Sequence, residues 1–139
     1  MRMRHIILSL LSLMLTHGSV FHLQSQSVAF AFDQTFDSYG DISWEKEKAH
    51  LDNFAIALQQ DPSLIGYIIV YAGKRTCVGE AKGRARRAKE YLVKSRRIPE
   101  HRIKWVDGGH SEKFRVILQP VPAHAPEITS TPTLQSTDV

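Results

Sequence analysis

Cysteine is almost absent from this sequence, which has a single thiol, Cys77, among its 139 residues. One cysteine cannot form a disulfide within the chain, so the fold has to be stabilised by its core. Pairing of Cys77 with another chain and an inert position in a loop both stay open. The seven histidines stand singly, and no Cys/His group has metal-ligand spacing. We therefore expect no metal site and no cofactor.

Arrangements typical of catalysis are missing as well. Asp107 with His110, or Asp41 with His50, could be drawn as acid–base pairs. Neither pair lies at a recognisable spacing from a nucleophile or an oxyanion device, and an aspartate beside glycines more often forms a turn. We expect the protein not to be an enzyme and assign no catalytic residue.

The apolar run at the start of the chain is too short to span a membrane. Ile6–Leu15 has about ten residues, roughly half of what a helix needs to cross the hydrocarbon core. The mature protein is therefore expected to have no transmembrane helix.

The beginning of the chain instead has the three zones of a secretory signal peptide. Arg2 and Arg4 give a positive first zone, the apolar run follows, and Ala29-Phe30-Ala31 matches the pattern that signal peptidase cuts. We assign residues 1–31 to a cleaved signal peptide and place the mature protein in the periplasm or cell envelope. An earlier cut near Gly18 and an uncleaved anchor are the alternatives.

Residues 32–121 have the pattern of one small α/β domain, a two-layer α+β sandwich in the order β-α-β-α-β-β. Leu51, Phe54, Ala55 and Leu58 recur at the spacing of an amphipathic helix. The predicted elements are a strand over 32–38 ended by a turn at 39–41, a helix between Ser43 and Asp61, a central strand over 66–72, a helix over 80–97, a strand over 103–107 ended by a turn at Gly108-Gly109, and a strand over 114–119.

After Pro120 the composition changes to proline, threonine, serine and alanine. Such a segment buries too little apolar surface to offset the entropy of ordering it. We predict that residues 122–139 form a disordered tail.

Positive charge is concentrated in the middle of the chain. Between Lys74 and Lys104 there are twelve basic residues and three acidic ones, although the whole chain carries only +4. Basic helices of this kind can follow nucleic acid phosphates. No aromatic RNA-binding motif accompanies this one, and an exported protein rarely meets nucleic acid, so we expect no nucleic-acid partner.

The order of elements and several motifs resemble the C-terminal, periplasmic domain of OmpA-like, peptidoglycan-associated proteins. The family's long helix carries R-A-x-x-V-x-x-Y-L, and this chain has Arg84-Ala85 and Tyr91-Leu92 at that spacing. The other matches are the L-x-x-x-A-x-x-L stripe at Leu51, Ala55 and Leu58, the G-I-x-x-x-R-I motif met by Arg97-Ile98 and Arg102-Ile103, and the glycine pair Gly108-Gly109.

The resemblance implies a ligand site that this chain matches by half. In the family, an aspartate after the second strand and the arginine of R-A together hold the diaminopimelate of peptidoglycan, whose ammonium and carboxylate need one acid and one planar base. Arg84 stands at the arginine position. The acid's place is taken by the loop that contains Lys74 and Arg75, which would repel an ammonium.

Three candidate binding residues follow from this comparison and from charge: Arg84, Arg75 and Lys74. Arg84 is either a carboxylate clamp or a solvated base paired with Glu80 four residues earlier. Lys74 and Arg75, beside a helix N-terminus, could form a pocket for an anionic envelope component. The leading hypothesis is a non-catalytic envelope module that binds peptidoglycan. The alternative is a structural or protein-interaction module that has kept the fold and lost peptidoglycan binding.

Overall fold

Four strands and two main helices follow one another in the predicted order. The structure is a computed structural model that describes residues 35–129; the predicted signal peptide and residues 130–139 of the predicted tail lie outside this range. The elements are β1 (Asp37–Tyr39), α1 (Trp44–Gln60), β2 (Leu64–Gly73), α2 (Glu80–Glu90), a π-helical turn η1 (Tyr91–Ser95), a 3-10 turn η2 (Glu100–Arg102), β3 (Ile103–Ser111) and β4 (Arg115–Pro122).

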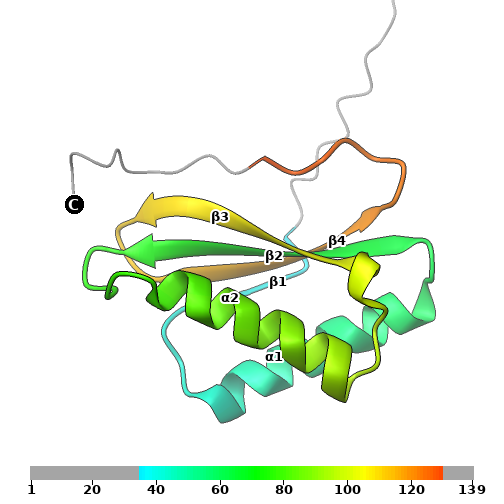
Figure 1. Cartoon of the computed structure of the whole chain (residues 1–139), viewed down its shortest axis with the longest axis horizontal. Helices are drawn as coiled ribbons and strands as arrows, with labels where there is room; N and C mark the ends of the chain where they lie inside the picture. The colour runs from blue at the N-terminus through cyan, green and yellow to red at the C-terminus, as the bar shows by residue number, and fades with distance from the viewer. Residues whose placement is uncertain (1–34, 130–139) are drawn as a thin grey trace, which may run out of the picture. The chain divides into compact units, whose positions relative to one another are not determined.

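The strands form one mixed sheet in the order β1-β4-β2-β3. β2 lies in the middle, parallel to β3 and antiparallel to β4, and β4 is also antiparallel to β1. Both helices cover the same face of the sheet, with α2 next to β2 and β3 and α1 next to β1 and β4 (Figure 1). The predicted two-layer α+β fold is therefore confirmed for the described residues.

The core lies between the helices and the sheet. The predicted stripe of α1 is fully buried there, because its spacing puts Leu51, Phe54, Ala55 and Leu58 on one face. α2 contributes Ala85 and Ala88, whose small side chains let the helix lie close to β2 and β3. The sheet supplies the opposite side, which includes Ile68, Val70, Ile103, Val116 and Leu118.

A buried carboxylate joins the two helices. The side chain of Glu47 in α1 is fully buried, accepts a hydrogen bond from the hydroxyl of Tyr39 at 3.1 Å, and pairs with Nη2 of Arg87 at 2.5 Å. The guanidinium of Arg87 also lies 4.4 Å from the ring centre of Trp44. Burial, and then the charge of Glu47, raise the pKa of Tyr39, so the phenol stays protonated and keeps donating to Glu47.

The first strand differs from its prediction. β1 has only three residues, and Tyr39, which was expected in a turn, is its buried residue. Phe36, which lies within the predicted strand, precedes β1 in the structure and is 43% exposed, although its ring still lies 5.7 Å from that of Phe54. Tyr39 lies on the core side because its hydroxyl reaches Glu47 and its ring centre lies 4.9 Å from that of His50.

The predicted turn at Gly108-Gly109 is also wrong, since β3 continues through it to Ser111. The pairing with β2 slips there by one residue, so that Val70 is opposite Asp107 and Tyr71 is opposite Gly109. A Cβ atom on Gly108 would lie 2.6 Å from the ring of Tyr71. The glycine thus makes room for an aromatic ring within a bulged strand.

The helix predicted over 80–97 is shorter and changes type. α2 ends at Glu90, and the helix continues as the wider π-helical turn η1 to Ser95. The helical conformation has ended by Arg97. Arg97 has a φ of 57°, and the N–H of Ile98 donates to the carbonyl of Leu92 at 3.1 Å. This is the left-handed helix ending that usually carries glycine.

The segment after β4 packs on the sheet face that the helices leave open. Residue 122 was predicted to begin a disordered tail, but it ends β4, and the following segment crosses the far side of the sheet (Figure 1). Ala125 and Ile128 pack against the cluster of Tyr67, Ile69 and Val121. Glu127 binds Nζ of Lys104 at 3.0 Å. The packed chain therefore extends well beyond residue 121.

Candidate functional site

Three loops meet at one end of the sheet and enclose a groove of about 610 Å³, the loop groove. The loop after β1 leads into α1, the loop after β2 leads into α2, and the third joins β3 to β4. The carboxyl ends of the parallel strands β2 and β3 lie at this end, which is why their loops are neighbours. The lining residues are Gly40, Asp41, Gly73, Lys74, Arg75, Thr76, Glu80, Glu112, Lys113 and Phe114.

Arg84 lies behind this groove and contacts three of its lining residues. Its Nη2 atom binds Oδ1 of Asp41 at 2.5 Å and Oε1 of Glu80 at 3.0 Å, and its guanidinium lies 4.4 Å from the ring centre of Phe114. Burial lowers the pKa of Arg84, but the hydrogen bond and charge of Asp41, helped by Glu80, raise it overall. The guanidinium is therefore a fixed positive charge between two carboxylates.

The other terminal nitrogen of Arg84 is unused. Its Nη1 atom is buried and has no hydrogen-bond partner among the residues that the structure describes. An unsatisfied buried donor costs about 1–3 kcal/mol, so such groups are rare in folded proteins. The Asp41 side chain that covers Nη2 is 73% exposed, whereas that of Arg84 is only 17% exposed. The base is therefore largely buried, and the acid that covers it is largely exposed.

The two other predicted residues line the same groove. Nζ of Lys74 pairs with Oε1 of Glu112 at 3.2 Å across the groove, between the second and third loops. Arg75 makes no ion pair within residues 35–129, so its charge is available to a ligand. The structure thus brings Lys74, Arg75 and Arg84 to one place.

Local hydrogen bonds and one close contact fix the second loop. The N–H of Gly73 donates to Oγ1 of Thr76 at 2.8 Å, and the N–H of Thr76 donates back to the carbonyl of Gly73 at 2.9 Å. A Cβ atom on Gly73 would lie 2.3 Å from the backbone nitrogen of Phe114. Only glycine permits this approach, which holds the second loop against the third.

The N-terminus of α2, predicted to attract an external anion, already has an internal one. Glu80 is the first residue of the helix, and its Oε2 accepts the N–H of Cys77 at 3.2 Å. A carboxylate is favourable at this position because of the helix dipole. The predicted pairing of Arg84 with Glu80 is present, but Glu80 also reduces the positive potential beside Lys74 and Arg75.

The sequence did not identify two acids of the groove, Asp41 and Glu112, as partners of its basic residues. Asp41, drawn as a possible partner of His50, binds Arg84 instead, and His50 Nδ1 lies 2.7 Å from Asp37 Oδ2. Glu112 drew no prediction. The signal for Asp41 was its place beside Gly40 in the turn after the first strand, but nothing in the spacing links it to a helix residue 43 positions later.

A second hollow, of about 310 Å³, lies between α1 and the turn after η1. Asp52 at its wall accepts hydrogen bonds from the Tyr91 hydroxyl at 2.7 Å and from Nε of Arg96 at 2.6 Å. Burial raises the pKa of Asp52, but these hydrogen bonds and the charge of Arg96 lower it overall. These three polar groups are hydrogen-bonded to one another, so their role is to hold α1 against the end of the second helix.

Asp107, drawn as a possible acid–base partner of His110, accepts the N–H of Gly109 at 2.8 Å, a hydrogen bond typical of a residue that shapes the backbone. Within residues 35–129, no three histidine, cysteine or acidic side chains gather closely enough to hold a metal ion. Over the same range, no helix has the length and apolar character needed to cross a membrane. Cys77 is a free, exposed thiol.

Comparisons with protein-family models, with characterised proteins and with solved structures gave no match for this chain. The likeness to OmpA-like domains therefore stays a prediction from the motifs and the order of elements.

Proposed function

We propose that this protein is an exported, non-catalytic binding module of the cell envelope, whose loop groove holds a ligand that carries both a carboxylate and an ammonium group. The peptide part of peptidoglycan has this chemistry. The observation that carries the proposal is Arg84, fixed between Asp41 and Glu80 with Nη1 unsatisfied. The acid expected after the second strand is replaced by acids from the first loop and from the start of α2.

Ligand entry would exchange one carboxylate for another. The exposed Asp41 side chain can swing away, and a ligand carboxylate can then replace it on Nη2 of the guanidinium. A second, parallel hydrogen bond to Nη1 would also require the groups that bury this atom to move aside. The released Asp41, together with Glu80, can accept the ligand's ammonium. Arg84 stays paired throughout, so the exchange leaves no buried charge without a partner.

The balance of charge in the loop groove favours a zwitterionic ligand of this kind over a polyanion. Four bases meet at the groove, Lys74, Arg75, Lys113 and Arg84, but three acids lie among them, Asp41, Glu80 and Glu112. A phosphate polymer or lipid headgroup would be attracted by the bases and repelled by the acids at close range. A ligand with both charges can satisfy both sets.

The test is co-sedimentation of the chain, as purified from cells, with peptidoglycan sacculi. We expect pelleting at moderate salt, and we expect Arg84→Ala and Asp41→Lys each to reduce it. Arg86→Ala is the matched control, because Arg86 lies on the same helix, is exposed and has no ion pair among the described residues. Absence of pelleting at low and moderate salt would sink the proposal. Pelleting that fades with salt and ignores Arg84→Ala would indicate unspecific attraction.

One observation favours the alternative, a protein-interaction module without peptidoglycan binding. Arg84 already has two carboxylates within hydrogen-bonding distance, so its role could be to attach α2 to the first loop. In that case Arg84→Ala lowers the free energy of unfolding, and neither the parent chain nor the variant binds sacculi.

Export has its own test. The chain recovered from cells should begin at or near Phe32 when its N-terminus is sequenced. An intact Met1 on a cytoplasmic protein would overturn the envelope assignment.

A further inference from the structure

Strand β3 forms one edge of the sheet, next to α2 (Figure 1). Within the described residues, no strand pairs with its outer side. Such an edge presents backbone N–H and C=O groups to which another extended chain can bond. The stretch Ile103–Val106 is the regular part, because the register slips only after Asp107.

A groove of about 320 Å³, the edge groove, runs between this strand and α2. On the strand side it is lined by Trp105, which is 36% exposed although it is one of the largest apolar side chains. On the helix side lie Arg86, Lys89 and, beyond the end of α2, Val93. An aromatic and an aliphatic side chain thus lie beside open backbone groups and exposed bases.

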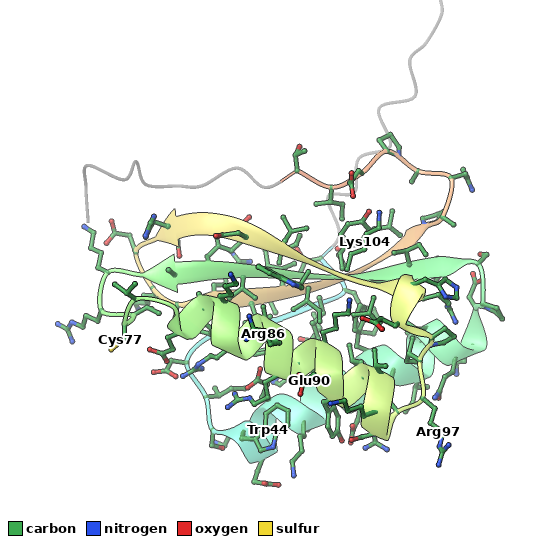
Figure 2. All side chains as sticks on the ribbon, in the orientation of Figure 1. Trp44, Cys77, Arg86, Glu90, Arg97 and Lys104 are labelled. Atoms are coloured by element: carbon green, nitrogen blue, oxygen red, sulfur yellow. The ribbon has the colours of Figure 1, made fainter. Side chains whose placement is uncertain are left out.

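The charge left uncompensated at the edge groove is positive. Its two acids are already paired, Glu100 with Lys89 at 3.3 Å and Glu90 with Lys94 at 3.7 Å. Arg86 has no ion pair within residues 35–129; it lies on α2 (Figure 2) and lines the edge groove together with Trp105. Lys82, exposed and without an ion pair in the same range, lies one turn earlier on the same side of the helix.

We propose that the open edge of β3 receives an extended, acidic segment of another polypeptide as an added strand. Backbone hydrogen bonds to Ile103–Val106 would hold the segment, as in other cases of strand addition to a sheet edge. Its side chains on the helix side would meet Trp105 and the free charges of Arg86 and Lys82. A second copy of this chain fits poorly, since pairing β3 with its own copy would bring two such basic helices close together.

The probe is a synthetic peptide of alternating glutamate and valine, long enough to pair with residues 103–106, and its charge-reversed counterpart is a peptide of alternating lysine and valine. The chain as purified from cells is titrated with each, and amide hydrogen exchange is measured. We expect the glutamate peptide to slow exchange at residues 103–106 and the lysine peptide not to. Arg86→Glu should weaken binding about tenfold or more, and Trp105→Thr should also weaken it.

Arg115→Glu is the matched control, because Arg115 is exposed and free of ion pairs in the described range but lies on β4, an inner strand. It should leave the affinity unchanged. The proposal is overturned if exchange at residues 103–106 does not slow, if both peptides bind equally, or if Arg115→Glu acts as strongly as Arg86→Glu. It is also overturned if protection rises with protein concentration alone, since β3 then pairs with a second copy. None of these outcomes depends on the loop groove.

Discussion

Replacing Glu47 tests whether the buried carboxylate joins the two helices. Glu47→Ala removes a charge-assisted hydrogen bond to Arg87 and leaves the buried hydroxyl of Tyr39 without its acceptor. The first loss is about 1.5–3 kcal/mol and the second about 1–3 kcal/mol. The side chain of Arg87 is 44% exposed and can be rehydrated, which places the total at the lower end, about 3 kcal/mol.

Glu47→Gln separates the charge from the shape. Glutamine has nearly the same volume and keeps one oxygen for the Tyr39 hydroxyl, but its NH2 group then faces Nη2 of Arg87, and two donors cannot bond. The charge-assisted hydrogen bond to Arg87 is lost while the Tyr39 hydroxyl keeps its acceptor, so we expect a loss of about 2 kcal/mol, smaller than that of Glu47→Ala. Glu45→Gln is the control, since Glu45 is exposed and its pair with Lys48 lies on the surface; its effect should stay within about 0.5 kcal/mol.

Urea unfolding followed by circular dichroism measures these differences, and thermal unfolding gives a second reading. For a domain of this size, a loss of about 3 kcal/mol corresponds to a fall in Tm of more than about 10 °C. The reasoning is refuted if Glu47→Ala costs no more than Glu45→Gln. It is also refuted if Glu47→Gln is as harmful as Glu47→Ala, because the charge would then carry the whole effect and the Tyr39 hydroxyl none.

Three further predictions concern stability. Gly83→Ala should raise the free energy of unfolding by about 0.5–1 kcal/mol, since Gly83 is helical and its Cβ would meet nothing within 4 Å; Gly73→Ala should instead be strongly destabilising, and equal effects would contradict the structure. Arg97→Gly should stabilise by about 1 kcal/mol because it relieves a left-handed residue; Arg97→Ala keeps that conformation and should not. The lowered pKa of Asp52 means that its contribution is present above its unfolded pKa and is lost as the pH falls through its folded pKa. Urea midpoints should therefore fall less steeply below about pH 4 in Asp52→Asn than in the parent chain, and parallel profiles would contradict this.

Local pattern was enough to predict much of the fold. The stripe of α1 and the continuous apolar strand β2 came from spacing and composition, because both are buried against one continuous surface. The predictions failed where a distant residue decides the outcome. Tyr39 turns inward because Glu47 lies beneath it, and Gly108 stays in a strand because the ring of Tyr71 occupies the space that a Cβ atom would need.

The same limit applies to the loop groove. Arg84, Arg75 and Lys74 could be chosen from motif and charge, and all three meet at the groove. The acid of the site could not be chosen, because Asp41 reaches Arg84 only through the antiparallel pairing that brings β1 beside β4. Composition also fails for residues 123–129, where a few apolar side chains find an open sheet face to pack on.

The close approach of Gly73 to the third loop has a mechanical consequence for selectivity. Two of the three walls of the loop groove touch backbone to backbone at this glycine, so neither can yield without the other. The wall that holds Asp41 approaches the third loop less closely, since a Cβ atom on Gly40 would lie 3.5 Å from the carbonyl oxygen of Phe114, and Asp41 meets Arg84 through its side chain. The width of the groove between Lys74 and Glu112 is therefore fixed before a ligand binds. The part that can adjust to the ligand is the Asp41 side chain that covers Arg84.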